Sequence, residues 1–381
     1  MKVAIVGGKL QGIEASYLAR EAGWKAILID KKKNPPAARL CSSFYHIDIV
    51  KDFFNLRRYL RKVDLIIPAV EDIAVLDVLQ RISQETKIHL AYDARAYYVT
   101  HSKKNSNHLF KKLGIQQPRS WPECGLPVIA KPSVSSGSYG VSKISNKDEL
   151  DTFIKKVGPG LEGWVLQEYL EGPSYSIEVL GLDGHYTALQ VTELEIDSDY
   201  DCNRVLAPAE IPESLDKQIK EIAITLAKSI DLKGIMDAEF ILDKGVLKIL
   251  EIDARLPSQT PTVVYKSTGI NMLELISDIF AKGMLPEIYE LKFLAGVVYE
   301  HIKVWQNELK FPGEHIMGES NSLKIVYNFF GADVSITNFN TLSFPWVATL
   351  TIIGETKKQA WAKRRQVIEN IRSYIKNLNV S

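Results

Sequence analysis

Two alternating stretches on either side of a tight-turn signal constrain this chain most. Residues 234–240 and 250–255 each alternate apolar with polar side chains, which is the period of a β-strand. The intervening Asp243-Lys244-Gly245 predicts a turn, so the two stretches would pair as an antiparallel hairpin. One face of that hairpin would carry four carboxylates and one arginine, namely Asp237, Glu239, Glu251, Asp253 and Arg255. Crowded acids favour a hard cation such as Mg²⁺ between them, and a neighbouring arginine suits a phosphate.

Length and composition limit the class of protein. At 381 residues the chain can hold two or three domains with their own cores. Its hydrophobic content of 46% and charged content of 24% are typical of a soluble globular protein. A formal net charge of +1 provides no field to attract nucleic acid or an anionic membrane, so neither is an expected partner. Three scattered cysteines and a strand pattern that begins at once predict a cytoplasmic protein with reduced thiols.

The first 93 residues alternate strand-like and helix-like segments, which predicts a parallel sheet covered on both faces. The loop from Gly7 to Gly12 joins the first strand to the first helix, and Asp30 ends the second strand. This arrangement only partly matches a dinucleotide-binding motif, because Lys9 stands where the motif needs glycine. An NAD-dependent oxidoreductase is therefore an alternative that leaves the acidic hairpin unexplained. Anions are still favoured at such a helix start.

Basic residues and small residues gather in the middle of the chain. Lys103 and Lys104 begin a predicted helix over residues 101–113, with Ser102 as a plausible N-cap. Lys131 ends a predicted strand and leads into a Gly/Ser-rich loop, where small side chains would let backbone N–H groups approach a phosphate. This loop is not a Walker A motif, and taken alone it could be a flexible surface hairpin. The connector 167–170 follows another strand and could bind an adenine edge.

The order of these features along the chain resembles the ATP-grasp ligases. The resemblance implies an α/β protein with the ATP-grasp fold, in which two small domains clamp ATP. It implies a Rossmann-like N-terminal parallel α/β domain over residues 1–93. An ATP-grasp domain would follow over 94–290, with a small lid subdomain at about 124–180. The remaining residues, 291–381, would form an antiparallel α+β region that completes the substrate site.

The same resemblance implies roles for individual residues. ATP would be bound by Lys104, Lys131, Ser135, Ser136, Gly137, Ser138, Gln167, Glu168, Tyr169, Leu170 and Glu178. Many family members carry a ribose-binding glutamate where Ser174 stands, so Glu178 is considered as its substitute. Glu239, Glu251 and Asp253 would hold two Mg²⁺ ions, with Mn²⁺ as an alternative metal. Arg255 and Lys131 would be the catalytic residues that balance charge on the transferred phosphate.

A narrower resemblance extends from end to end. The segments 7–12, 200–202, 234–237, 251–265 and 299–301 are similar to the ATP-grasp ligases of pyrrolysine biosynthesis. That similarity implies that the carboxyl group of 3-methyl-D-ornithine, or of D-ornithine, is joined to the ε-amine of L-lysine through an acyl phosphate, with ADP and phosphate as by-products. A ligase for another amino-acid pair is the alternative within the family.

The narrower resemblance also suggests where these amino acids bind. Substrate-binding candidates are Asp237, Arg255, Ser258, Gln259, Thr260, Glu300 and His301. Candidates at the N-terminal sheet edge, for lysine or part of a nucleotide, are Lys9, Leu10, Gln11, Asp30, Glu71 and Asp72. His301 taken alone would more often be a structural residue. Only small-molecule partners are expected, and the oligomeric state is left open.

Overall fold

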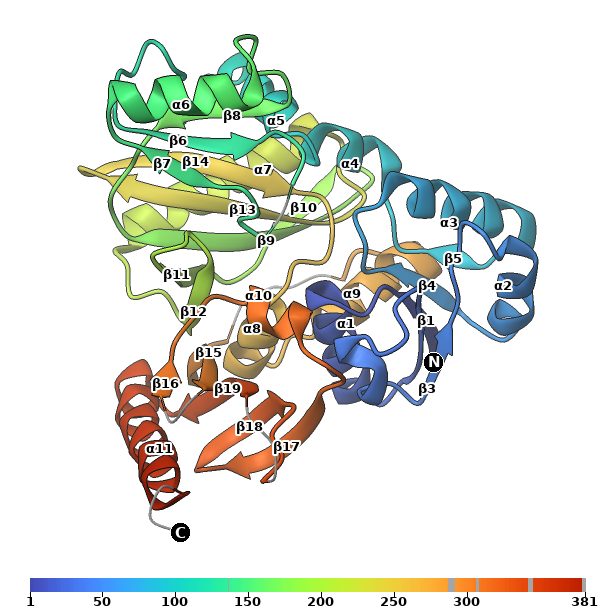
Figure 1. The fold of residues 1–381 in the computed structure, drawn as a ribbon. Coiled ribbons are helices and arrows are strands. Elements are labelled where there is room, and N and C mark those ends of the chain that lie inside the picture. Colours follow the sequence, from blue (N-terminus) through green and yellow to red (C-terminus); the bar gives the residue numbers. More distant parts are fainter. Residues whose placement is uncertain (136, 287–291, 306–307, 342–344, 379–381) are drawn as a thin grey trace.

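The computed structural model describes residues 1–135, 137–286, 292–305, 308–341 and 345–378, and Figure 1 shows their arrangement. They form three separate sheets, one parallel, one large and antiparallel, and one of three strands. In the part of the chain that is described, no helix has the length and apolar character needed to cross a membrane.

The N-terminal region is a five-stranded parallel sheet in the order β3-β2-β1-β4-β5. Its elements are β1 (Lys2–Val6), α1 (Leu10–Glu21), β2 (Lys25–Asp30), the 3₁₀ helix η1 (Pro36–Arg39), β3 (Ser43–His46), α2 (Phe53–Leu60), β4 (Leu65–Pro68), α3 (Ile73–Thr86) and β5 (His89–Leu90). Alternate residues of β1 point to opposite faces, so Val3 packs on the α1 side and Ala4 on the side of α2 and α3. The expected parallel sheet with helices on both faces is confirmed. The edge strand β3 was not anticipated.

A large antiparallel sheet forms the centre of the molecule, in the order β14-β13-β9-β11-β12-β15-β19-β18-β17. Its strands are β9 (Ser174–Leu182), β10 (His185–Ala188), β11 (Thr192–Ile196), β12 (Cys202–Ala207), β13 (Gly234–Asp243), β14 (Val246–Asp253), β15 (Gly296–Trp305), β16 (Glu308–Lys310), β17 (Lys324–Phe329), β18 (Ala332–Thr337) and β19 (Trp346–Gly354). The predicted hairpin is present as β13 and β14. The stretch 185–195 forms two strands, β10 and β11, which both pair with β9.

A small three-stranded sheet lies over the hairpin end of the large sheet (Figure 1). It contains β6 (Val128–Pro132), β7 (Ser142–Ile144) and β8 (Trp164–Glu168), with α6 (Lys147–Val157) on its outer side. Its own apolar cluster includes Val128, Ile144 and Leu150. The small sheet therefore has a separate core, and its other face is turned toward β13 and β14.

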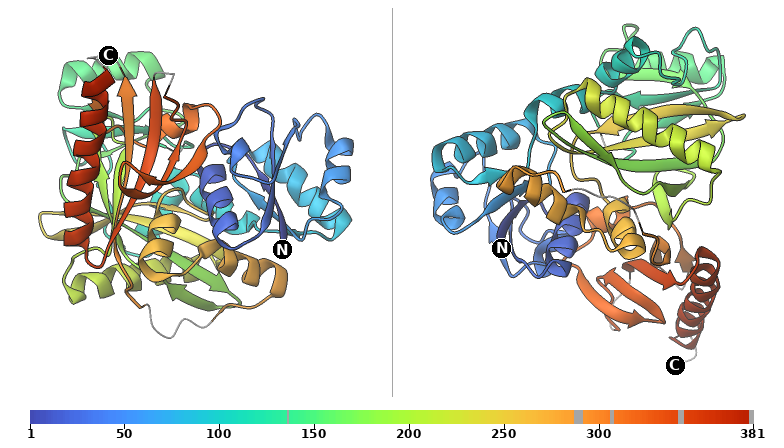
Figure 2. Two further views of the ribbon diagram at one scale, coloured as in Figure 1. Left: turned by 90° about the horizontal axis from the view of Figure 1, so that it is seen from below. Right: turned by 180° about the vertical axis from the view of Figure 1, so that it is seen from behind.

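Helices cover the outer surfaces of the large sheet and connect the regions. They are α4 (Ala94–Thr100), α5 (Lys103–Lys112), α7 (Glu213–Ser229), α8 (Thr260–Thr268), α9 (Met272–Ser277), the π-helix η2 (Asp278–Lys282), α10 (His315–Glu319) and α11 (Lys357–Leu378). Seen from behind in Figure 2, α7 lies across the face of the large sheet opposite the small sheet. The helix α11 packs on β15 and β19. The predicted N-cap of α5 is confirmed, because the Ser102 side chain accepts the Asn105 N–H.

Candidate functional site

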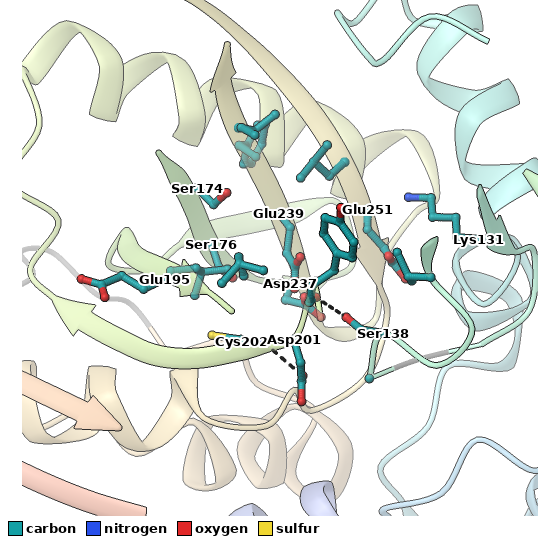
Figure 3. A pocket seen from close by; sticks show the side chains of 18 of the residues that line it. Lys131, Ser138, Ser174, Ser176, Glu195, Asp201, Cys202, Asp237, Glu239 and Glu251 are labelled. Carbon is teal, nitrogen blue, oxygen red and sulfur yellow. Dashed lines mark hydrogen bonds between the residues drawn. The ribbon is translucent and has the colours of Figure 1, made fainter. Parts of the chain in front are cut away.

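A cavity of about 770 Å³ lies between the small sheet and the acidic hairpin (Figure 3). Lys131 and Ser138 approach it from the small sheet and its loop, and Glu239 and Glu251 face them from the hairpin. Sixteen of the residues expected at a site line it: Lys131, Ser135, Gly137, Ser138, Gln167, Glu168, Tyr169, Leu170, Asp237, Glu239, Glu251, Asp253, Arg255, Ser258, Gln259 and Thr260. Ser136, also expected there, lies outside the described residues.

The acids of the hairpin meet in pairs. Asp237 is directly opposite Asp253, and Glu239 is directly opposite Glu251. Burial, reinforced by Glu251, raises the pKa of Glu239 to about 7, and burial together with Glu251 raises the pKa of Asp253 to about 7. Burial and the neighbouring Asp253 also raise the pKa of Asp237. The carboxylates of the hairpin therefore repel one another, and a bound cation would reduce this repulsion.

One of these acids is already neutralised by a lysine. The Nζ atom of Lys103 lies 2.7 Å from Glu251 Oε1 and 2.5 Å from the Ser135 carbonyl oxygen. Burial alone would raise the pKa of Glu251, but Lys103 and Lys131 outweigh it and lower that pKa. Lys131 is 7% exposed and forms no ion pair within the described residues, and burial lowers its pKa. A buried ammonium group without an acidic partner is suited to a phosphate.

The structure corrects the expectation for Lys104. Its side chain is exposed and does not line the cavity, whereas the adjacent Lys103 is 6% exposed and does. Successive residues of a helix point about 100° apart, so the phase of α5 decides which of the two lysines faces the hairpin. That phase is set where Ser102 caps the helix and where Lys103 N–H bonds to the Ser133 carbonyl oxygen.

The connector that was expected to bind adenine lines the other end of the cavity. Gln167 is buried, and its Oε1 atom has no hydrogen-bond donor among the described residues. The Glu168 side chain is held by Arg119 at 2.9 Å and by Lys248 at 3.1 Å. Hydrogen bonding to Arg119 accordingly lowers the pKa of Glu168 to about 2. The Gln167 amide, and not the Glu168 carboxylate, is therefore free to contact a ligand through its side chain.

The proposed substitute for the ribose-binding glutamate is also corrected. Ser174 and Ser176 of β9 line the cavity, but Glu178 does not, and it is completely buried. Glu178 lies opposite Asp237 in the sheet, toward Thr260 rather than toward the connector. Burial raises its pKa to about 7. A ribose at the connector end could not reach this carboxylate without movement of the sheet.

The donor set of the hairpin fits a metal that is shared with phosphate. No three His, Cys, Asp or Glu side chains in the described part of the chain are arranged as a complete metal site by themselves. Mg²⁺ in nucleotide sites usually needs only one or two carboxylates, because phosphates and water supply the other oxygens. Asp237 Oδ1 is buried and makes no hydrogen bond in the structure as described. Facing acids with such a spare oxygen are chemically suited to a hard cation.

Arg255 links the hairpin to the N-terminal region. Its Nη2 atom donates to Asp253 Oδ2 at 2.9 Å, and its Nε atom lies 3.0 Å from Glu71 Oε1. Gln11 Nε2 donates to the same Glu71 oxygen at 3.0 Å. Two of the N-terminal candidates, Gln11 and Glu71, are thus connected to the cavity through Arg255, although they do not line it.

The other N-terminal candidates have local roles in the structure and do not line the cavity. Asp30 accepts the Gly8 N–H at 2.7 Å and the Lys32 N–H at 2.6 Å, so it stabilises the glycine loop itself. Asp72 caps α3 by accepting the Ala74 N–H. Lys9 is exposed, and Leu10 approaches Gly318 of α10. These contacts explain the polar pattern at this edge without a dinucleotide.

The segment Ser258-Gln259-Thr260 borders the cavity and is held from three directions. Glu14 of α1 accepts the Gln259 N–H at 3.3 Å and the Thr262 N–H at 2.6 Å, and thereby caps α8. Burial raises the pKa of Glu14 to about 7. His301 Nε2 lies 3.1 Å from Gln259 Oε1, and Ser258 Oγ donates to Glu314 Oε1 at 3.1 Å. The segment is thus a fixed wall of the cavity.

Two substrate candidates of the C-terminal region are corrected. Glu300 is completely buried and receives hydrogen bonds from Arg204 and Arg364 at 2.8 Å each, so it holds β15 to α11 instead of a substrate. His301 does not line the cavity and supports it through Gln259. Burial, with a smaller effect from His315, lowers the pKa of His301 to about 3, which keeps the ring neutral.

Some residues of the cavity were not anticipated. Besides Lys103, the structure brings Asp201 and Glu314 to the wall of the cavity. Asp201 belongs to the segment 200–202 that was noted in the sequence only for its resemblance. Glu314 follows Pro312 and Gly313 in a loop without periodicity, so no local pattern pointed to it.

Comparison with known proteins agrees with this geometry. Residues 100–259 match the family model described as an ATP-grasp domain. A 3-methyl-D-ornithine–L-lysine ligase (PylC) from Methanosarcina barkeri is 33% identical over 364 residues, which cover 95% of this chain and 95% of that protein. The same name is carried by a protein of Methanosarcina acetivorans that is 32% identical over 364 residues.

Solved structures match the fold at low sequence identity. The biotin carboxylase domain of Hydrogenobacter thermophilus 2-oxoglutarate carboxylase, in complex with MgADP, ADP and bicarbonate, gives a TM-score of 0.75 at 16% identity, covering 97% of this chain and 89% of that one. An N5-carboxyaminoimidazole ribonucleotide synthetase in complex with ADP gives 0.71 at 16% identity, covering 100% and 98%. The expected ATP-grasp fold is thereby confirmed.

The sequence identity of 32–33% to the Methanosarcina enzymes extends over nearly the whole of both chains, which is sufficient to assign the family. The chain therefore belongs to the ATP-grasp family and, within it, to the family of the 3-methyl-D-ornithine–L-lysine ligases.

Proposed function

We propose that this protein joins the carboxyl group of 3-methyl-D-ornithine, or D-ornithine, to the ε-amine of L-lysine in pyrrolysine biosynthesis. ATP is consumed, and ADP and phosphate are released. The observation that carries the proposal is the meeting of two buried lysines, four carboxylates and Arg255 in one cavity, in a chain 33% identical to a ligase of that name. This set can bind a nucleotide phosphate at one end and amines at the other.

The chemistry follows from the poor reactivity of a carboxylate toward amines. Transfer of the ATP γ-phosphate to the ornithine carboxylate gives an acyl phosphate, whose phosphate leaves readily when an amine attacks. Such a transfer depends on positioning and on charge neutralisation. Lys103 and Lys131 would neutralise phosphate oxygens, and Arg255 would face the transferred group from the far side of Asp253. Lys103 thus replaces Lys104 in the role first expected for the latter.

A divalent metal would complete this arrangement. Glu239, Glu251 and Asp253 would hold Mg²⁺, with two ions expected and Mn²⁺ as an alternative metal. When bound, the metal supplies positive charge to the β- and γ-phosphates. The spare Asp237 oxygen supports this assignment, or the binding of the ornithine ammonium group beside the metal site.

The Gly/Ser-rich loop over residues 132–140 would shield the reactive acyl phosphate from water. Ser138 of this loop donates to the Tyr200 carbonyl oxygen of the β11–β12 connection, across the cavity from the small sheet. This contact supports a lid role for the loop and for the small sheet. We assign residues 1–93 to an N-terminal domain, 94–290 to the ATP-grasp domain with the lid at about 124–180, and 291–381 to a C-terminal region.

The test is a reaction with ATP, Mg²⁺, D-ornithine or its 3-methyl form, and L-lysine. ADP release and an isopeptide-linked product, both dependent on the two amino acids, are the expected result. ATP turnover with a different pair of amino acids in a substrate panel would move the protein to another specificity within its family. Tight binding of NADH in calorimetry, without binding of ATP and Mg²⁺, would contradict the proposal.

A further inference from the structure

Acids outside the hairpin also line the cavity, and no metal is assigned to them. Four of them are Glu195, Asp197, Asp201 and Glu314. Glu195 and Asp201 are labelled in Figure 3, on the side away from Lys131. An acid is available to a ligand only where its oxygens are not already held by other residues.

Three of the four acids are already engaged. Glu195 pairs with Arg204. Asp197 accepts the Asp201 N–H at 3.0 Å and the Gly313 N–H at 2.7 Å. Asp201 accepts the Cys202 N–H at 3.0 Å, and its other oxygen lies 2.6 Å from His315 Nδ1. Asp197 and Asp201 therefore serve to fix the loop around residue 313.

Glu314 in that loop is different. It is 8% exposed, and Oε1 accepts from Ser258 Oγ at 3.1 Å. Its other oxygen, Oε2, is buried and makes no hydrogen bond with good geometry among the described residues. Leaving a buried carboxylate oxygen without a donor is costly, so the site is suited to a ligand that brings N–H groups. An ammonium group is the simplest such ligand.

Both substrates of the proposed reaction carry amines, and two cavity acids have a spare buried oxygen, Asp237 and Glu314. Asp237 lies opposite Asp253 in the hairpin, within the phosphate and metal region. It is therefore placed for the ornithine molecule, whose carboxylate receives the phosphoryl group. Glu314 lies outside the hairpin, next to Ser258, and is therefore placed for the second amino acid.

We propose that Glu314 binds the attacking ε-ammonium group of the lysine substrate and accepts its proton, an inference that rests on the proposed ligase function. The neutral nitrogen then forms a C–N bond with the acyl carbonyl carbon, and the C–O bond to phosphate breaks with its electron pair going to phosphate. The nitrogen passes a second proton to the departing phosphate. One N–H hydrogen remains on the amide product.

The surroundings of Glu314 favour this proton transfer. Burial and the neighbouring Asp201 raise its pKa to about 8, while Ser258, Arg255 and the Gln259 side chain act in the opposite direction. His315, the next residue, is a further polar group close to it. A lysine ammonium has an ordinary pKa of about 10.4, so a carboxylate with a raised pKa is a better acceptor for its proton than an exposed one.

The two half-reactions separate this inference from the proposed function. With D-ornithine, ATP and Mg²⁺ but no lysine, hydroxylamine traps the acyl phosphate as a hydroxamate, and it attacks as a neutral amine. Glu314→Gln should form hydroxamate at the wild-type rate. Its rate of isopeptide formation with lysine should fall by about 10²-fold or more, because general base catalysis contributes about 10²–10⁴-fold. The exposed Glu319 on α10 provides the matched control, and Glu319→Gln should keep both rates.

The other outcomes separate the ligase function from the role of Glu314. Absence of hydroxamate with the wild-type protein would overturn the proposed function itself. An unchanged isopeptide rate in Glu314→Gln, or a parallel loss of hydroxamate and isopeptide, would overturn the role of Glu314 and leave the ligase function standing. Should Glu314→Gln fail to bind ATP in calorimetry, Glu314→Asp takes its place. Retraction of the carboxylate by one methylene should then lower isopeptide formation alone, and equal loss of both rates would again overturn the role.

Discussion

Glu71 Oε1 lies 3.0 Å from Arg255 Nε, so a residue of the N-terminal region holds the arginine at the end of the acidic hairpin. The same arginine is fixed on its other side by Asp253. An arginine restrained from two sides presents its guanidinium group in one orientation, which is what recognition of a transferred phosphate requires.

Glu71→Gln should release one of these restraints. We expect ligation to slow by up to about 10²-fold, because a small misplacement of a positioning group can have that effect. ATP affinity should stay unchanged, since Lys103 and Lys131 do not contact Glu71. Steady-state kinetics with calorimetric ATP titration measures both quantities. Glu85→Gln, which alters an exposed ion pair of the same region, is the control. Equal activity of the two variants would contradict the role given to Glu71.

Lys103 and Lys104 provide a matched pair for the phosphate site. Lys103→Ala should weaken ATP binding by about 1.5–3 kcal/mol, the usual contribution of a hydrogen bond to a charged group. Lys104→Ala removes the same charge from an exposed position and should leave the affinity unchanged. Titration calorimetry with ATP and Mg²⁺ compares the two. A larger loss in the Lys104 variant would restore the original sequence-based assignment.

Glu251→Gln tests the metal assignment. The change removes one negative charge from the hairpin while keeping the shape of the side chain and an oxygen near Lys103. Turnover should become undetectable because the site would lose a ligand for the cation, and circular dichroism should remain that of the wild type. Titration of activity with Mg²⁺ and with Mn²⁺ would show whether added metal compensates. Full activity of this variant would remove Glu251 from the metal site.

Glu300→Gln tests the structural role given to that residue. Glu300 is buried between Arg204 and Arg364, and breaking a buried pair on one side usually costs about 3–5 kcal/mol. The free energy of unfolding should fall by that order, measured with chemical denaturant. The activity of the remaining folded protein should be normal. Glu369→Gln, an exposed acid on α11, should change stability by less than about 1 kcal/mol. A raised KM for lysine at unchanged stability would return Glu300 to the substrate site.

The depressed pKa of His301 predicts a dependence of stability on pH. Its pKa is about 3 in the folded protein against 6.5 as the ordinary value, so between these limits the unfolded chain binds the proton more tightly. Stability is therefore lost as the pH falls below about 6.5, by about 1.4 kcal/mol per pH unit at most. His301→Gln cannot take up this proton. Between pH 6.5 and pH 5 the wild type should lose about 1.6 kcal/mol more of its unfolding free energy than the variant does. Parallel pH curves would contradict the assignment.

The alternation of residues 234–240 and 250–255 was sufficient to predict the hairpin and its acidic face, because strand periodicity is a local property. The choice between Lys103 and Lys104 was not local. Ser102 indicates where α5 begins, but only the contact with Glu251 shows which side of the helix faces the cavity. The sequence therefore located the helix correctly, but the lysine chosen from it, Lys104, is the exposed one of the two.

Contacts between distant segments could not be predicted from the sequence. Glu14 and Glu314 were not among the candidates, and Glu71 was a candidate whose contact with Arg255 could not be foreseen, because each residue reaches the site by packing of one region on another. Glu300 and His301 belong to a Tyr-Glu-His stretch within a strand. From the sequence alone, a buried salt bridge or a buried neutral histidine cannot be distinguished from a binding site.

The bond from Glu14 to the start of α8 has a consequence for how this protein can be divided. Residues 100–259 carry the family's nucleotide-binding signature, yet the wall of their cavity is held by a carboxylate from the first helix of the chain. If the first region were cut away, the Gln259 and Thr262 N–H groups would lose their acceptor, and Arg255 would lose Glu71. We therefore expect residues 100–259 expressed alone to lose the support of both the cavity wall and Arg255.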